Sequence, residues 1–120
     1  MTELLSASVN IRVPQAILVW NVSEDLPDDG DWTLSTTFTG EDGESIDQLG
    51  FKIVDGAHVG TWIFRHGDSS TQLNYQISPN RVGNRWTVVF PTTGLRSEHG
   101  TWQAALDVDG ADRGTDTGTY

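Results

Sequence analysis

Four aspartates near the end of the printed sequence have the residue type and close spacing that could bind a hard cation such as Ca²⁺. They are Asp107, Asp109, Asp112 and Asp116. Their spacing differs from that of an EF-hand loop, because Gly110 directly follows Asp109 and no glutamate stands at the twelfth position. A second acidic cluster is typical of a solvated loop and comprises Glu24, Asp25, Asp28, Asp29 and Asp31. We therefore expect neither cluster to hold a metal ion.

Three histidines, His58, His66 and His99, could bind zinc if the loops that carry them met in space. All three lie at predicted strand ends or turns, where a histidine is commonly an ordinary surface group. The sequence contains no cysteine, no Gly-x-Ser-x-Gly elbow and no pattern of a Ser/His/Asp triad. We therefore expect a protein that is not an enzyme and that has no metal, cofactor or catalytic residue.

The 120 residues carry a net charge of −10, and the charge is unevenly distributed. Residues 1–55 hold eleven acidic residues against Arg12 and Lys52, whereas residues 56–106 hold two acidic residues against four arginines. Binding to nucleic acid needs a clustered basic face that neutralises phosphates, so this distribution argues against a nucleic-acid partner. The sequence also has no apolar run of membrane-spanning length and no signal-peptide pattern at its start, which argues against a membrane partner.

The elements that must position any site are strands, because apolar and polar residues alternate throughout the chain. Residues 101–108 show this period of two over their whole length, and similar segments recur about every ten residues between Gly, Asn, Asp and Pro turns. The pattern predicts an all-β, single antiparallel immunoglobulin-like sandwich of about seven or eight strands without a disulfide. A small β-barrel is the alternative. We expect an N-terminal arm (1–8), a sandwich domain (9–109) and a polar C-terminal tail (110–120).

Five tryptophans supply much of the large apolar surface of the chain. Four of them are in phase with aliphatic or Phe neighbours, which predicts that they point into the core. An exposed pair of coplanar tryptophans would instead indicate a sugar-binding platform. The continuous apolar segment Ile17-Leu18-Val19-Trp20 predicts a strand buried on both faces.

Two groups of polar residues are candidates for contact with a protein partner. Gln72, Asn74 and Gln76 share one face of a predicted strand, and Arg65 and Arg85 would join them if their strands were neighbours. The tail has no aliphatic side chain larger than Ala111 and would be disordered alone. We expect it to pack against a neighbouring chain, with Arg113 and Tyr120 among the contact residues.

Three segments carry a resemblance to a known group of proteins: Val-Pro-Gln at 13–15, Trp-Thr-Val-Val-Phe-Pro at 86–91, and Trp-x-Ala-x-Leu-x-Val-Asp-Gly at 102–110. Together with the Trp-bearing strand after the first segment, this pattern over residues 9–110 resembles small accessory proteins of long-tailed phages that infect actinobacteria. Those proteins are immunoglobulin-like sandwiches that decorate capsids or belong to tails. The resemblance implies a structural role with no catalytic residues.

On that resemblance, the leading hypothesis is a virion protein, a capsid decoration or minor tail component made in the host cytoplasm. Its partners would be capsid or tail subunits and copies of itself, and repeated weak contacts would supply avidity. A carbohydrate-binding or adhesion module with an exposed Trp is the first alternative. The second is a small acidic inhibitor or immunity protein that masks a basic partner with the loop at residues 24–31.

Overall fold

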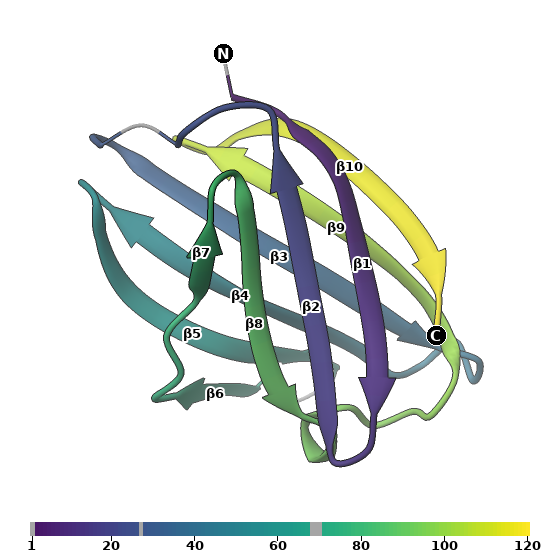
Figure 1. The fold of residues 1–120 in the computed structure, drawn as a ribbon. Helices are drawn as coiled ribbons and strands as arrows, with labels where there is room; N and C mark the ends of the chain where they lie inside the picture. The colour runs from purple at the N-terminus through teal and green to yellow at the C-terminus, as the bar shows by residue number, and fades with distance from the viewer. Residues whose placement is uncertain (1, 27, 68–70) are drawn as a thin grey trace.

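The computed structural model describes residues 2–26, 28–67 and 71–120, and strands account for most of them (Figure 1). One short 3-10 turn, η1 (Thr92–Gly94), interrupts the strands. The ten strands in these ranges are β1 (Leu4–Arg12), β2 (Gln15–Val22), β3 (Asp31–Gly40), β4 (Ile46–Val54), β5 (Ala57–His66), β6 (Thr71–Tyr75), β7 (Asn80–Val82), β8 (Arg85–Pro91), β9 (Gly100–Val108) and β10 (Ala111–Thr119).

The strands form two antiparallel sheets, with orders β1-β2-β8-β7 and β10-β9-β3-β4-β5-β6. These are the ABED and GFCC′C″ orders of an immunoglobulin variable domain, with one further strand, β6, beyond C″. The all-β, immunoglobulin-like sandwich expected from the sequence is therefore confirmed. The described chain has more strands than expected, because the short β7 and the C-terminal segment also pair.

Alternation of side chains explains how these sequences make a sandwich. On β3, the side chains of Trp32, Leu34, Thr36 and Phe38 are buried, while the intervening positions face away from the core. Rows of the same kind from β2, β4, β8 and β9 fill the space between the sheets. Burial of these rows against one another is the main favourable contribution to folding.

Four of the five tryptophans belong to this core, as the phase of the sequence predicted. Trp20, Trp32, Trp86 and Trp102 are all less than one tenth exposed. Trp32 packs edge-to-face on Trp86, with ring centroids 5.2 Å apart. The fifth, Trp62, points to the opposite side of its sheet, because its neighbours Thr61 and Ile63 are the buried residues of β5.

The prediction that β2 is buried on both faces is wrong. Leu18 and Trp20 are fully buried, but Ile17 and Val19 are only partly buried on the outer side of the four-stranded sheet. In the antiparallel register Ile17 lies beside Val89 of β8, which is 38% exposed. No further layer covers this side within the described residues, so the two side chains retain contact with solvent.

The structure differs from the expectation at both ends of the chain. The segment set apart as the arm 1–8 contributes to β1 from Leu4 onward, and Met1 lies outside the described residues. Most of the segment 110–120 forms β10 (Ala111–Thr119), which pairs antiparallel with β9 of its own chain; the expected contact with a neighbouring chain stays a prediction. Its outward positions are mostly threonines, which favour strands, and its inward positions lack the aliphatic side chains that mark a buried strand in sequence.

Gly118 explains why β10 can pack with so little apolar surface of its own. It pairs with Trp102, and a Cβ atom added at Gly118 would lie 2.5 Å from Cζ2 of the Trp102 ring. The indole therefore occupies the space that a side chain of β10 would otherwise fill. Trp102 supplies the apolar contact for both strands.

Candidate functional site

The side of the six-stranded sheet that faces away from the core carries mostly hydroxyl, amide and aromatic side chains. We call this surface the outer face. It extends over all six strands, because successive residues of a strand point to opposite sides of the sheet. Its members are Thr33, Ser35, Thr37 and Thr39 of β3; Ile46, Gln48 and Lys52 of β4; Trp62, Phe64 and His66 of β5; Gln72 and Asn74 of β6; Thr101, Gln103, Ala105 and Asp107 of β9; and Asp112, Thr115, Thr117 and Thr119 of β10.

One register row crosses the whole outer face. Each residue in it lies directly opposite the next on the neighbouring strand. With neighbouring strands about 4.8 Å apart, the five steps of the row span roughly 24 Å. The row is Thr117, Gln103, Thr37, Gln48, Phe64 and Gln72. Hydroxyl and amide groups thus lead continuously to an aromatic ring.

Three rings follow one another along the outward side of β5. Trp62 and Phe64 are partly buried, His66 is exposed, and the rings of Phe64 and His66 meet edge-to-face with centroids 4.7 Å apart. With Gln48 and Gln72 they line a shallow pocket of about 240 Å³. We call Trp62, Phe64 and His66 the aromatic strip.

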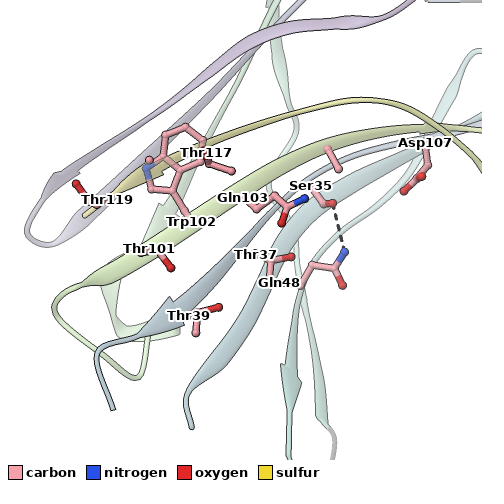
Figure 2. A pocket seen from close by; sticks show the side chains of 12 residues that line it. Ser35, Thr37, Thr39, Gln48, Thr101, Trp102, Gln103, Asp107, Thr117 and Thr119 are labelled. Atoms are coloured by element: carbon pink, nitrogen blue, oxygen red, sulfur yellow. Dashed lines mark hydrogen bonds between the residues drawn. The ribbon is translucent and has the colours of Figure 1, made fainter. Parts of the chain in front are cut away.

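A larger depression of about 580 Å³ lies beside this pocket, over β3, β4, β9 and β10 (Figure 2). Threonine and glutamine side chains make up most of its wall. Gln48 lines both depressions, so they adjoin at β4. A hydrogen bond of 3.3 Å from Gln48 Nε2 to Ser35 Oγ orients this shared amide (Figure 2).

Gly50 keeps the floor of the outer face open beside Trp62. It is the register partner of both Ser35 and Trp62, and a Cβ atom added there would lie 2.6 Å from the Leu34 carbonyl oxygen. Because that contact is with backbone, a side chain at this position would displace β3. The small residues Ala105, Ser35 and Gly50 therefore form a low row that ends at the indole of Trp62.

A pair of carboxylates lies at one end of the outer face, where Asp107 of β9 is the register partner of Asp112 of β10. Burial raises the pKa of Asp107 above its ordinary value, and the negative charge of Asp112 raises it further. The folded protein therefore holds a proton on Asp107 more tightly than the unfolded chain does. The ionised pair opposes folding once the pH exceeds the ordinary aspartate range.

Replacement of Asp107 by asparagine is therefore expected to stabilise the protein near neutral pH. The gain should shrink as the pH falls toward the ordinary aspartate pKa of 3.8, because parent and variant are then both uncharged at this position. Thermal melts of Asp107→Asn and the parent across this pH range measure the difference. A variant that melts below the parent near neutral pH would contradict the expectation.

Of the residues expected to contact a partner, the structure brings Gln72 and Asn74 together on the outer face. Gln72 Nε2 donates a hydrogen bond of 2.8 Å to Asn74 Oδ1, and both side chains are exposed. Gln76 follows β6 and is also exposed. Asn74 and Gln72 lie beside their register partners on β5, which are Trp62 and Phe64 respectively.

The two arginines expected beside these amides lie elsewhere. Arg65 is in phase with the buried side of β5, and its guanidinium donates to the carbonyl oxygens of Thr93 and Gly94. Arg85 is on β8, in the other sheet. The condition for adding the arginines to this surface is therefore not met for Arg85, whose strand is in the other sheet, whereas Arg65 lies on the strand next to β6 but points to its other side.

The two tail residues lie in β10 and directly after it. Arg113 lies in the bulged part of β10 and is partly buried. Tyr120 exchanges backbone hydrogen bonds with Gly100, and its ring meets Phe38 edge-to-face with centroids 5.0 Å apart. Burial, together with nearby carboxylates, raises the pKa of the Tyr120 hydroxyl.

The residues weighed as metal ligands are dispersed. Among residues 2–26, 28–67 and 71–120, no group of three or more His, Asp or Glu side chains is placed to hold an ion. His58 instead makes a hydrogen bond of 2.8 Å with Thr61 Oγ1, and Asp109 accepts one of 2.8 Å from the backbone N–H of Asp31.

The aromatic strip as a set was not predicted from the sequence: His66 was a possible zinc ligand, Trp62 one of five tryptophans, and Phe64 carried no expectation. The sequence does show that apolar side chains lie on both sides of this strand. Trp62 and Phe64 alternate with the apolar Ile63, so either the two rings or Ile63 must face outward. The set with Trp62 and Phe64 is the more apolar, because Ile63 is in phase with Thr61 and Arg65, yet the structure buries Thr61 and Ile63. The contribution of Gln48 from β4 could be seen only once the strand order was known.

In the described ranges no helix is long and apolar enough to cross a membrane. The chain was compared with models of known protein families, with curated proteins and with solved structures. None of them matches it.

Proposed function

We propose that this chain is a non-enzymatic binding module that recognises an uncharged glycan on its outer face. The observation that carries the proposal is the aromatic strip, which lies between the amides of Gln48 and Gln72 at the end of a continuous hydroxyl and amide row. Sugars present C–H groups on their ring faces and hydroxyls at their edges. Aromatic rings fit the first of these, and amides and hydroxyls fit the second.

The distribution of charge supports an uncharged ligand. Charged side chains on the outer face gather at one end, where Lys52, Asp107 and Asp112 lie, whereas the central row carries none. A sulfated or uronic acid polymer would find no cluster of arginines or lysines along that row. A neutral polysaccharide needs hydrogen-bond donors and acceptors instead, and the row supplies both.

The shape of the surface supports a chain-like ligand. The two adjoining depressions together extend from β10 to β6, across the strands rather than along them. A site of roughly 24 Å accommodates several sugar units side by side. Because the depressions are shallow, the ligand would lie on the sheet with its ends free, so an internal segment of a long polymer would fit.

The test is retention by soluble neutral polysaccharides in affinity electrophoresis, with glucans, xylan, mannan and galactan as probes. Trp62→Ala is expected to weaken binding to the retained polymer by about 30-fold, the effect of losing one central aromatic anchor of about 2 kcal/mol. The Tm should change little compared with a core substitution, because this ring faces away from the core.

Val89→Ala is the matched control, since it removes an exposed apolar side chain from the opposite sheet. It should bind as the parent does. If the parent is retained by none of the probes, or if Trp62→Ala and the parent are retained equally, the proposed function is wrong.

The virion role is a second candidate, and the apolar patch on the four-stranded sheet favours it. Ile17, Val19 and Val89 lie together on the outer side of that sheet, away from the aromatic strip. Such a patch suits contact with a protein lattice. The two roles are compatible, since a module docked through this patch would leave its outer face open to a glycan.

A further inference from the structure

β6 is a free edge of the six-stranded sheet. It pairs with β5 through residues 71–75 and has no strand on its other side within the described part of the chain (Figure 1). The backbone N–H and C=O groups along such an edge form a ready template for another strand. Folded proteins usually protect such edges with charge, proline, bulges or a covering segment.

The other three sheet edges have protection of this kind. β7 has only three residues, and one of them is Arg81, which stacks over Trp86 at 5.4 Å. β1 and β10 cover each other, and the backbone N–H of Ala7 donates a hydrogen bond of 2.9 Å to Asp116 Oδ2. Bulges bend both strands where they meet.

Among the residues that the structure describes, none gives β6 such a device. Its sequence, Thr-Gln-Leu-Asn-Tyr, continues into Gln-Ile-Ser, so eight consecutive positions carry no charge and no proline. Its pairing with β5 is regular, without a bulge. The edge therefore presents nothing that opposes the addition of a strand.

We propose that β6 pairs antiparallel with β6 of a second copy of this chain, which joins the two six-stranded sheets into one continuous sheet. The occupant is a second copy because the edge is self-complementary. With Leu73 on the two-fold axis, Gln72 lies opposite Asn74 of the partner subunit. These two amides already bond to each other within one chain, at 2.8 Å, so they can exchange that bond across the axis. Two-fold pairing of identical surfaces is the commonest form of protein association.

The pairing places two outer faces side by side. The row through Phe64 and Gln72 then continues into the partner subunit, and the two aromatic strips flank the new strand pair. The proposed glycan site is thereby doubled on one surface, which raises avidity for a long polymer. The dimer itself does not depend on the proposed function, because it rests on the strand edge alone.

Sedimentation velocity of the full chain over a concentration series tests the dimer. The parent is expected to shift from monomer to dimer as its concentration rises, and more readily at higher salt, because each copy carries a net charge of −10. Gln72→Lys combined with Asn74→Lys places lysines opposite lysines and should weaken self-association at least tenfold. Gln72→Glu combined with Asn74→Glu should do the same.

Mixing the lysine and glutamate variants is expected to restore a heterodimer, because opposite charges then meet across the axis. Restoration also shows that both variants are folded. Ala111→Lys combined with Thr115→Lys is the control, since it adds the same charge to exposed positions of the opposite edge strand, β10, and should leave self-association as in the parent.

A parent that stays monomeric to about 1 mM, or a mixture that stays monomeric, overturns the proposal. The proposal is also overturned if Gln72→Lys combined with Asn74→Lys leaves self-association unchanged. Because glycan retention can be measured on the parent chain at concentrations where it is monomeric, with Gln72 and Asn74 intact, failure of the dimer and failure of the glycan site are distinguishable.

Discussion

Replacement of Trp20 by alanine is expected to lower the free energy of unfolding by about 3–5 kcal/mol, the range for removing a fully buried large aromatic side chain. Trp20 is 0% exposed, and its ring meets Phe51 of the opposite sheet edge-to-face at 5.5 Å. Its Nε1 also donates a hydrogen bond of 3.2 Å to the Ser35 carbonyl oxygen, so the indole ties the two sheets together. Urea denaturation followed by circular dichroism measures the loss.

The expected decrease in Tm is roughly 10–25 °C for a domain of this size. Val19→Ala is the matched control, because Val19 is adjacent to Trp20 in β2 and points to the partly exposed side. It should cost much less than Trp20→Ala. Equal costs for the two variants would mean that the space between the sheets is not the dominant core.

Arg96→Ala is expected to cost about 3–5 kcal/mol, because it leaves a buried carboxylate without its cation. Asp47 points inward from β4 with its side chain 3% exposed, and it accepts hydrogen bonds from Arg96 Nε at 2.8 Å and from the Arg96 backbone N–H at 3.1 Å. The guanidinium also donates to the carbonyl oxygens of Ile46 and His66. It thus fastens the segment before β9 to β4 and β5. Chemical denaturation of the purified variant gives the change.

A second variant separates the buried charge from the lost contacts. Arg96→Ala combined with Asp47→Asn removes the unpaired carboxylate and should be more stable than Arg96→Ala alone. Glu44→Ala, which removes an exposed carboxylate from the turn before β4, should change stability by less than about 0.5 kcal/mol. A double variant no more stable than the single one would show that the charge of Asp47 is not the source of the cost.

The Asp47–Arg96 ion pair could not be predicted from the alternation of apolar and polar residues. Asp47 stands in the inward phase of β4, two residues before the buried Leu49, where a carboxylate is unexpected. Its partner is 49 positions away, on a segment with no regular period. Only the crossing of the chain from one sheet to the other brings the two together.

The position of the aromatic strip beside the amides of Gln48 and Gln72 also depends on strand order and register. Trp62 and Phe64 come from one strand, Gln48 from the strand before it and Gln72 from the strand after it. Each lies on the outward side of its strand. That Gln48 and Gln72 flank the same rings follows from the order and register of β4, β5 and β6.

The sequence by itself determined the fold class, the inward rows and the four buried tryptophans, because a period of two divides every strand into two sides and apolar surface leaves water. It also showed that β6 carries no charge. Tertiary structure alone decided that the tail closes the sheet as β10, that Arg65 and Arg85 lie apart, and that β6 is an edge. Those features arise from pairing between distant segments, whose register depends on the whole sandwich and not on any single strand.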